Sequence, residues 1–492
     1  MNWIRRFGWI KYVIAFLVPV LVVLSINQHL DNDSWDVLAQ GRYIVENGIY
    51  HEDVLSMHEG LHTVVQNYAF SVVFYWIHLV FGASGIYIAM ILLFLVLLFL
   101  LYKVCMLISD KNVKLSLVLM AVTGSILALE FVVTRAQMID YVVFMALIYV
   151  MELYIKTGRN KYLWWIPGLS IVLVNFHASV WWIIFAIIGT YIIDGFRRPK
   201  KILQGYRLKP LILISVISAV VGLINPYGVE MVTSIFAAYG GMSSLGVVSE
   251  LASFNPMAGY GIIYYLMIVI VVALYAFAKR RPRVRYLLLF FGFLFMGLSS
   301  VKGMSEFLLV MFFPLAYVYK DFKIPKLFYN QKIGRIVTVW VGVLVMCISI
   351  VMAVRATMMA EDRPNRAMEE AMDVIDNEVG DKNKRELKIY VGYNQGGYVE
   401  YRGYPAYLDP RGAEFMKSVN GKDGILEEWI GLDTGKTKVD EFLGKYDFDF
   451  LVIEEYYEEA LADLKDERYE LIYSDDENET RVYKKVEAPQ KV

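Results

Sequence analysis

The sequence predicts a mainly α-helical polytopic membrane protein that crosses the bilayer about 11 times and ends in a small α/β domain. Three observations predict this fold class. Hydrophobic residues make up 57% of the 492 residues, above the 45–50% that is about usual for soluble domains. They gather in runs long enough to span roughly 30 Å of hydrocarbon. Lys and Arg lie between these runs in a one-sided pattern, and the composition becomes polar after position 356.

The first apolar run follows Arg5 and Arg6 and includes Lys11. It is too long for a signal-peptide core, and no small-residue cleavage site follows it, so we expect a retained first helix. The predicted spans are 10–27, 84–102, 115–134, 138–155, 162–176, 178–195, 210–225, 260–278, 286–301, 304–319 and 336–354.

The distribution of positive charge predicts the orientation, because Lys and Arg concentrate in cytoplasmic loops. With the N-terminus in the cytoplasm, the outer loops before residue 355 carry only Arg42, Arg135 and Lys302. A further crossing by the apolar stretch 67–81 would reverse this asymmetry. We therefore expect 67–81 to lie along the outer interface and the C-terminus to be extracytoplasmic.

This orientation gives two domains: a transmembrane domain over 1–355, with its first outer loop at 28–83, and an extracytoplasmic domain over 356–492. In the second, we expect a charged helix within 361–387, strands at 386–393, 404–411 and 448–454, helices at 439–446 and 456–467, and a hairpin of 469–475 with 480–485. Residues 394–397 read as a turn. Walker and GxGxxG motifs are absent from the sequence.

The first outer loop is the most polar segment before the tail, and it opens with closely spaced acids. Asp31 and Asp33 are two residues apart at a predicted span end, a pattern that can bind a divalent cation such as Mg²⁺ or Mn²⁺. One carboxylate alone can act as a general base. Asp53 is a further candidate acid in this loop. The alternative, stronger for Asp36, is that these acids cap the amphipathic helix that follows.

Four polar residues at outer span ends are candidates for binding the phosphate of a lipid-linked substrate: Arg135, His177, Asn225 and Lys302. The alternatives are that Arg135 reaches lipid headgroups, that His177 and Asn225 end helices, and that Lys302 pairs with Glu306. The predicted span interiors hold few ionisable groups, with Glu130 the main exception. Ion transporters usually place such groups near the midplane.

The segments LDNDSWDVLAQGRYIVENG, NFH, NPYG and YNQGGYVEYRGYPAYLDPR resemble bacterial membrane proteins of the GT-C glycosyltransferase superfamily. The resemblance implies a plasma-membrane enzyme that moves a sugar, with inversion, from a polyprenyl-phosphate carrier to an extracytoplasmic acceptor. The acceptor would be a cell-envelope glycan, a lipid or a protein, as in polysaccharide biosynthesis. It further implies that Asp31 or Asp33 is the base or metal ligand, that Asp53 is a second acid, and that Arg135, His177 and Lys302 bind the carrier phosphate.

Three other functions fit parts of the same pattern. A lipid-linked glycan polymerase or ligase would share the orientation but use an oligosaccharide donor. A transporter or flippase would need polar residues through the midplane. A non-enzymatic assembly protein would use the tail to dock partners, and its Asp31, Asp33 and Asp53 would together tolerate replacement by Asn.

Overall fold

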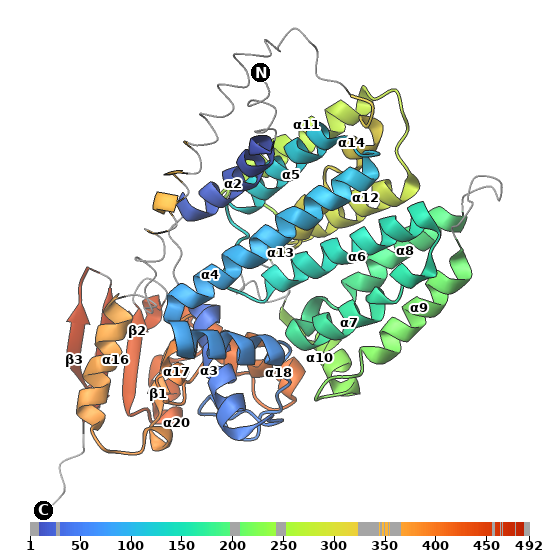
Figure 1. Ribbon diagram of the computed structural model, residues 1–492. Helices are drawn as coiled ribbons and strands as arrows, with labels where there is room; N and C mark the ends of the chain where they lie inside the picture. Colours follow the sequence, from blue (N-terminus) through green and yellow to red (C-terminus); the bar gives the residue numbers. More distant parts are fainter. Residues whose placement is uncertain are drawn as a thin grey trace, which may run out of the picture. The chain divides into compact units, whose positions relative to one another are not determined.

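The structure is a computed structural model of the whole chain (Figure 1). It describes residues 9–25, 30–196, 207–242, 252–322, 344, 347–348, 350–352, 354, 366–454, 458–462, 464, 466–477 and 479–486. The boundary that the sequence predicts near residue 355, and most of the last predicted span, lie outside these residues.

The chain divides into two compact units. Unit 1 comprises Met1–Gln28, Ile86–Asn225 and Gly246–Ala360, and unit 2 comprises His29–Gly85, Pro226–Leu245 and Glu361–Val492. The first outer loop therefore belongs to the same compact unit as the C-terminal tail.

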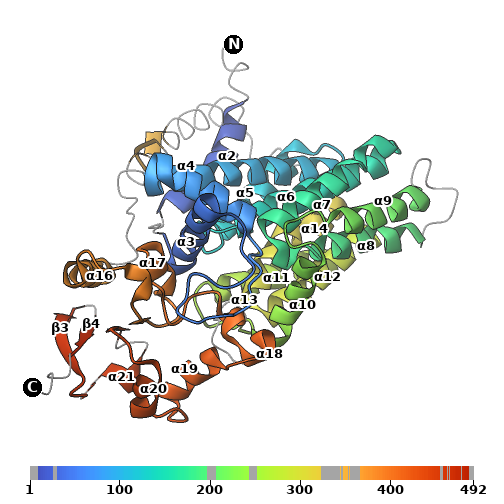
Figure 2. The same ribbon diagram turned by 90° about the horizontal axis from the view of Figure 1, so that it is seen from below.

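Unit 1 is built from helices. Its helices are α2 (Ile10–Ser25), the later part of α4 (Tyr68–Ile108), α5 (Val113–Leu127), α6 (Gln137–Thr157), α7 (Trp165–Phe176), α8 (Ile183–Phe196), α9 (Leu208–Val221), α11 (Gly261–Ala276), α12 (Val284–Ser299), α13 (Val301–Val310) and α14 (Phe313–Val318). Viewed from below, α6, α7, α8 and α9 lie side by side (Figure 2).

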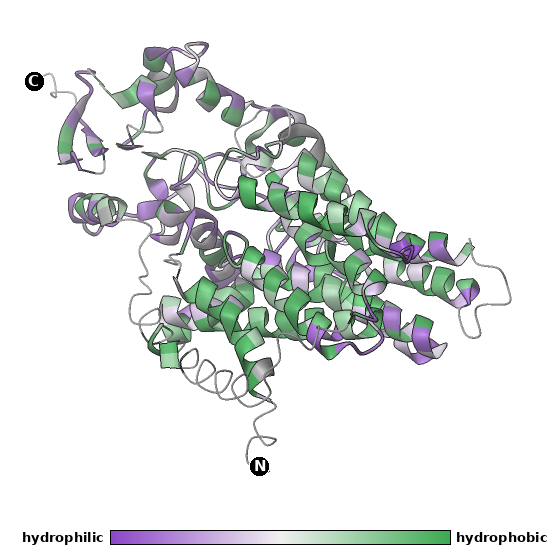
Figure 3. Ribbon diagram, turned by 90° about the horizontal axis from the view of Figure 1, so that it is seen from above, coloured by the Kyte–Doolittle hydropathy of each residue, from purple (hydrophilic) through white to green (hydrophobic). Residues whose placement is uncertain are grey.

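Most of these helices are hydrophobic along their length (Figure 3). Within the described residues, four helical segments are long and apolar enough to cross a membrane: Tyr68–Ile108, Gln137–Thr157, Ala178–Phe196 and Val301–Val318. Shorter apolar helices occur at five further places where the sequence predicts spans. The positions of these helices agree with the predicted spans, and the total of about 11 crossings stays a prediction.

One ionic network is buried inside unit 1. The guanidinium of Arg285, in α12, donates from Nε to Glu152 Oε1 at 2.7 Å and from Nη1 to Asp194 Oδ2 at 2.9 Å. The hydroxyls of Tyr191 and Tyr286 also donate to Glu152. The sequence indicated Glu130 as the main ionisable residue inside the predicted spans, but Glu152 and Asp194 also lie inside them, and with Arg285 they join α6, α8 and α12.

In unit 2, the first outer loop forms α3 (Asn32–Asn47), as its apolar spacing predicts. The stretch 67–81 and the following span are continuous in α4, but Gly82 interrupts the helix with φ 62° and ψ −164°. Glycine takes this conformation without the penalty a Cβ would bring. The kink falls where the sequence separates the interfacial segment from the span.

The tail in unit 2 contains a four-stranded mixed sheet of order β1-β2-β4-β3. The elements of the tail are α16 (Arg366–Val379), β1 (Ile389–Tyr390), α17 (Gly396–Tyr401), α18 (Lys417–Asn420), α19 (Ile425–Asp433), α20 (Val439–Tyr446), β2 (Phe450–Glu454), α21 (Glu459–Ala462), β3 (Tyr469–Asp475) and β4 (Thr480–Lys485). Unit 2 also contains α10 (Val229–Met242), which precedes the tail in the sequence. β1 pairs with β2 in parallel, and β4 pairs antiparallel with β2 and β3. α16 packs beside β3 and β4.

The terminal hairpin, the strand at 450–454 and the helix at 439–446 confirm the predictions for the tail. The prediction of a strand at 404–411 is wrong, because that segment makes only isolated bridges through Ala406 to Ser56 and Ile389. Gly396 and Gly397 begin α17 instead of completing a turn. The segment 404–411 thus stays irregular, and it delivers side chains to the site described below.

The stability of the tail should depend on pH through Glu458. The Glu458 carboxyl accepts hydrogen bonds from the Tyr390 hydroxyl at 2.5 Å and from the Glu454 amide at 3.1 Å. Burial raises the pKa of Glu458 to about 7 from its ordinary 4.5, although these hydrogen bonds act in the opposite direction. The folded state therefore binds the proton more tightly than the unfolded state. Stability from this group is present below pH 4.5 and is lost as the pH rises to about 7.

We expect Glu458→Gln to remove up to about 3 kcal/mol of this pH dependence, because an amide keeps an acceptor for Tyr390 and cannot ionise. Thermal unfolding between pH 5 and 8 measures the slope for wild type and variant. Glu459→Gln, at an exposed neighbouring position, is the control. Equal slopes for wild type and Glu458→Gln would contradict the prediction.

Candidate functional site

The N-terminus of α3 holds the two acids that the sequence singles out first. Asp31 is the N-cap, and its Oδ1 accepts from the Ser34 amide at 2.9 Å and the Ser34 hydroxyl at 2.6 Å. Asp33 lies in the first turn of the same helix and is partly exposed. The capping role is thus present for Asp31, while Asp33 stands where a carboxylate favours the positive helix end.

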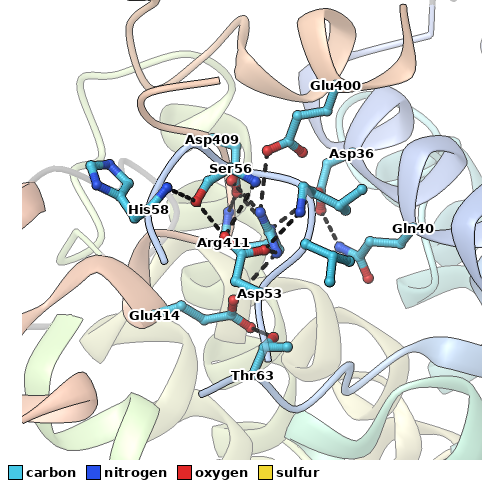
Figure 4. A network of polar contacts seen from close by, with 12 residues as sticks. Asp36, Gln40, Asp53, Ser56, His58, Thr63, Glu400, Asp409, Arg411 and Glu414 are labelled. Carbon is cyan, nitrogen blue, oxygen red and sulfur yellow. Dashed lines mark hydrogen bonds and ion pairs between the residues drawn. The ribbon is translucent and has the colours of Figure 1, made fainter. Parts of the chain in front are cut away.

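One turn further along α3, the chain enters a buried charged cluster centred on Arg411 (Figure 4). Five carboxylates form ion pairs with its guanidinium: Asp36, Asp53, Glu400, Asp409 and Glu414. We call these six residues the Arg411 cluster. They come from α3, the first outer loop, α17 and the segment after α17, all within unit 2.

The N–H donors of Arg411 are divided unequally among the five carboxylates. Nη1 donates to Asp53 Oδ1 at 2.6 Å, and Nε and Nη2 donate to the two oxygens of Asp409 at 2.9 and 2.6 Å. Nη2 also reaches Glu400 Oε1 at 3.2 Å. The nearest carboxylate oxygen of Asp36 is 3.7 Å from Nε, outside hydrogen-bond range. Arg411 therefore binds Asp53 and Asp409 closely and leaves Asp36 weakly paired.

Neutral groups complete part of the hydrogen bonding. The Ser56 hydroxyl donates to Asp53, and the Thr63 hydroxyl donates to Glu414. The Gln40 amide donates to Asp36 Oδ2 at 2.7 Å. These partners satisfy lone pairs but add no positive charge.

The pKa values in the cluster reflect its excess of acid. Burial raises the pKa of Asp36 to about 7, with the Asp409 charge acting in the same direction. Burial raises the pKa of Glu414 to about 8 and holds the pKa of Glu400 well above its ordinary value. Burial also acts to raise the pKa of Asp53, but Arg411 and Ser56 hold it below the ordinary value. Asp53 is therefore suited to remain ionised, which makes it a weak proton acceptor.

Two adjacent glycines allow the cluster to assemble. A Cβ on Gly396 would lie 1.8 Å from the Leu408 carbonyl oxygen and 2.7 Å from Asp409 Cα. A Cβ on Gly397 would lie 2.6 Å from the Asp36 amide nitrogen. The start of α17 thus packs directly on the backbone of α3 and of the 404–411 segment. This contact brings the carboxylate of Asp36 together with those of Glu400 and Asp409, which lie more than 360 residues later in the sequence.

We expect Gly397→Ala to destabilise unit 2 by about 1–3 kcal/mol, because the added methyl meets backbone atoms of Asp36 that cannot rotate away. Thermal unfolding of the purified protein measures the loss. Gly444→Ala in α20 is the matched control, since its Cβ would meet only the tip of Arg468 at 3.5 Å and alanine is the better helix former. Equal unfolding temperatures for the two variants would refute this account of the glycine pair.

The Arg411 cluster also contains a group of oxygen ligands suited to a metal. Among the described residues, ligand atoms of Asp36, Glu400 and Asp409 all lie within 4.8 Å of one another. The metal ligands that the sequence predicts, Asp31 and Asp33, are not in this group. Asp36, which the sequence reading favoured as a helix cap, is the first-loop acid that enters it.

His177 and Lys302 belong to a separate group of polar residues in unit 1. His177 Nδ1 lies 2.5 Å from Asp140 Oδ2, and Asp140 is fully buried. Lys302 interacts electrostatically with Asp140 and Glu306. His177 and Lys302 thus both interact with Asp140, and their part in binding a phosphate stays a prediction.

Asn225 donates to the Gly222 carbonyl at 3.0 Å, in the turn after α9. This bond is the helix-ending arrangement that the sequence offers as the alternative for Asn225. Arg135 is half-buried immediately before α6. The part of either residue in binding a substrate stays a prediction.

Sequence reasoning missed Asp140, Glu400, Asp409, Arg411 and Glu414. Three of these residues, Glu400, Asp409 and Arg411, lie in the segment YNQGGYVEYRGYPAYLDPR, which carries part of the family resemblance. The resemblance did not assign a role to any residue of this segment. Asp140 looked like an ordinary first-turn acid of α6.

No protein-family model matches the chain, and no curated protein matches it in sequence. Solved structures of the oligosaccharyltransferase from Archaeoglobus fulgidus do match in fold. The apo form has a TM-score of 0.62 at 10% identity, covering 94% of this chain and 72% of that one. The form tethered to an acceptor peptide with the NVT sequon has a TM-score of 0.59 at 12% identity, covering 94% and 71%.

A third structure, the archaeal oligosaccharyltransferase AglB from the same organism with an inhibitory peptide and a dolichol-phosphate, has a TM-score of 0.59 at 10% identity, covering 93% of this chain and 71% of that one. Oligosaccharyltransferases are glycosyltransferases of the GT-C superfamily. At these identities the likeness concerns the fold. The chain therefore shares the fold of a GT-C membrane glycosyltransferase, in agreement with the resemblance carried by its motifs.

Proposed function

We propose that the chain is a membrane glycosyltransferase that transfers a sugar from a polyprenyl-phosphate carrier to an acceptor outside the cytoplasm. The observation that carries the proposal is the likeness to oligosaccharyltransferase structures over more than nine-tenths of the chain. One of those structures contains a dolichol-phosphate and another an acceptor peptide. We extend to this chain the general classes, a lipid-phosphate donor and an extracytoplasmic acceptor, in a bacterial plasma membrane.

The reaction needs a base near the acceptor hydroxyl and positive charge near the departing phosphate. The acceptor oxygen forms a bond to the anomeric carbon, the bond from that carbon to the phosphate oxygen breaks, and the acceptor proton passes to a carboxylate. Lys302 and His177 supply positive or hydrogen-bonding groups for the phosphate, with Arg135 and Asn225 as further candidates. Asp140 orients the His177 ring through the 2.5 Å contact at Nδ1.

Asp33 is our first choice for the base, with Asp31 as the alternative. Asp31 already accepts two hydrogen bonds from Ser34 through one oxygen. Asp53 is paired with Arg411, so we assign it an electrostatic part as the second acid. A Mg²⁺ or Mn²⁺ ion held by Asp31 and Asp33 would supply Lewis-acid stabilisation of the phosphate.

Sugar transfer in proteoliposomes tests the function. Polyprenyl-phosphate monosaccharides are supplied with and without Mg²⁺ or Mn²⁺, together with cell-envelope glycan, lipid and peptide acceptors. Release of polyprenyl phosphate is followed for wild type, Asp33→Asn and Asp31→Asn. We expect Asp33→Asn to lower the rate about 10²–10⁴-fold, as removal of a general base does, and Asp31→Asn to lower it less.

Parallel reactions with oligosaccharide donors distinguish the polymerase or ligase alternative. Equal rates for wild type and both variants would refute the assignment of the acids in α3. Movement of labelled lipid across the bilayer without sugar transfer would favour the flippase alternative. Full function in cells of an Asp31, Asp33 and Asp53 triple Asn variant would favour the assembly-protein alternative.

A further inference from the structure

We propose that Asp36, Glu400 and Asp409 bind one hard divalent cation, of the Ca²⁺ or Mg²⁺ class, which joins α3 of the first outer loop to the C-terminal tail. This site is separate from the Asp31 and Asp33 pair, and its existence does not depend on the proposed transferase activity.

The first argument is charge. The Arg411 cluster contains five carboxylates, and Arg411 is the basic side chain that pairs with them in the described part of the chain. Asp53, Glu400 and Asp409 have fully buried side chains, and Asp36 is 9% exposed at its side chain. One guanidinium cannot neutralise five buried carboxylates, and unbalanced buried charge is strongly unfavourable.

The second argument is unmet coordination. Asp36 Oδ1 and Glu400 Oε2 are buried and have no hydrogen-bond partner among the described residues. Both side chains extend toward the centre of the cluster (Figure 4). Buried polar atoms are nearly always satisfied, so two such oxygens in one cluster indicate a ligand that is not part of the chain.

The third argument is geometry. The ligand oxygens of Asp36, Glu400 and Asp409 lie within 4.8 Å of one another. Oxygens around one cation with bonds of about 2.0–2.6 Å are separated by no more than about 5 Å. Carboxylates are the ligands that Ca²⁺ and Mg²⁺ prefer, and water molecules usually complete their coordination.

The consequence for the fold follows from where the three ligands originate. Asp36 lies on α3, Glu400 on α17 and Asp409 in the irregular segment after it. The Gly397 contact holds the same two helices together. A cation at this point would strengthen that contact and fix the first turns of α3, which carry Asp31 and Asp33.

Metal binding by the full-length protein in detergent tests the inference. The protein is stripped with a chelator, then titrated with Ca²⁺, Mg²⁺ or Mn²⁺ alone by calorimetry, with Mn²⁺ binding also followed by electron paramagnetic resonance. We expect one tight site in wild type and an affinity at least about tenfold lower in Asp36→Asn and Glu400→Gln. Asp376→Asn is the matched control, because Asp376 pairs with Arg402 and Lys384 elsewhere in the tail.

Thermal unfolding provides a second readout, because a variant that only misfolds would lose stability both with and without the cation. In chelator at pH 8, above the pKa of about 7 for Asp36, Asp36→Asn should unfold at a higher temperature than wild type, because one buried negative charge is gone. Adding the cation should raise the unfolding temperature of wild type and Asp376→Asn but not that of Asp36→Asn. The proposal is overturned if wild type binds no cation, if Asp36→Asn and Glu400→Gln bind as wild type does, or if only Asp33→Asn loses binding.

Discussion

Replacing Arg411 by Gln should lower the stability of the protein by about 5 kcal/mol, near the upper end of what breaking a buried ion pair costs. The expected loss is large because Asp53, Glu400 and Asp409 would remain buried with no guanidinium beside them. Glutamine keeps a side-chain amide donor but no charge. Fluorescence-detected size-exclusion after heating, at a fixed scan rate, measures the apparent unfolding temperature.

Arg402→Gln is the matched control for Arg411→Gln. Arg402 also binds two carboxylates in the tail, Asp373 at 2.7 Å and Asp376 at 2.5 Å, but its side chain is 22% exposed. Water can solvate the acids that remain, so we expect a loss of about 1 kcal/mol. Adding Glu400→Gln to Arg411→Gln should recover part of the stability. Similar losses for the two arginine variants would show that the Arg411 cluster is not strongly desolvated.

The second large effect is expected inside unit 1, where Arg285→Met should cost about 3–5 kcal/mol. Glu152 and Asp194 would then be left buried without a cation among three packed helices. Because Glu152 and Asp194 are buried, dissolved salt screens their charges much less than it would at the protein surface. The apparent unfolding temperature and the yield of monodisperse protein in detergent measure the effect.

A charge-neutral triple variant separates lost charge balance from lost packing. Glu152→Gln, Asp194→Asn and Arg285→Met together remove every charge of the network and keep side chains of similar size, so they should be more stable than Arg285→Met alone. Arg280→Gln is the surface control, since Arg280 pairs with the exposed Asp321. If Arg285→Met and Arg280→Gln unfold at the same temperature, the network does not hold α6, α8 and α12 together.

The sequence predicted the helices of unit 1 well because the signal is local. A run of apolar residues indicates a span by its length alone, and the unit 1 helices lie where those runs occur. The kink at Gly82 falls between the stretch 67–81 and the predicted span 84–102. The tail hairpin and the strand Phe450–Glu454 were also predictable, since alternation and turn residues are properties of short segments.

The candidate site was only partly predictable. His177 and Lys302 were proposed from their place at predicted span ends, and their role stays a prediction. Their partner acid Asp140 could not be chosen from the sequence, since an acid in the first turn of a helix is common. The strand expected at 404–411 is absent, because the consecutive residues Tyr407 and Leu408 both lie in the tail core, which the alternation of a strand does not allow. That same irregular backbone presents Asp409 and Arg411 to α3.

The sequence by itself therefore determined that this is a helical membrane protein with a polar first loop and an α/β tail, because hydrophobic runs and their flanking charges act within about 20 residues of chain. The tertiary structure alone decided which acids matter together. Asp36 and Asp53 lie more than 300 residues before Arg411, and a close backbone contact at Gly397 unites α3 with α17. Burial then raises the pKa of Asp36, while Arg411 lowers that of Asp53, and both effects depend on neighbours in space rather than in sequence.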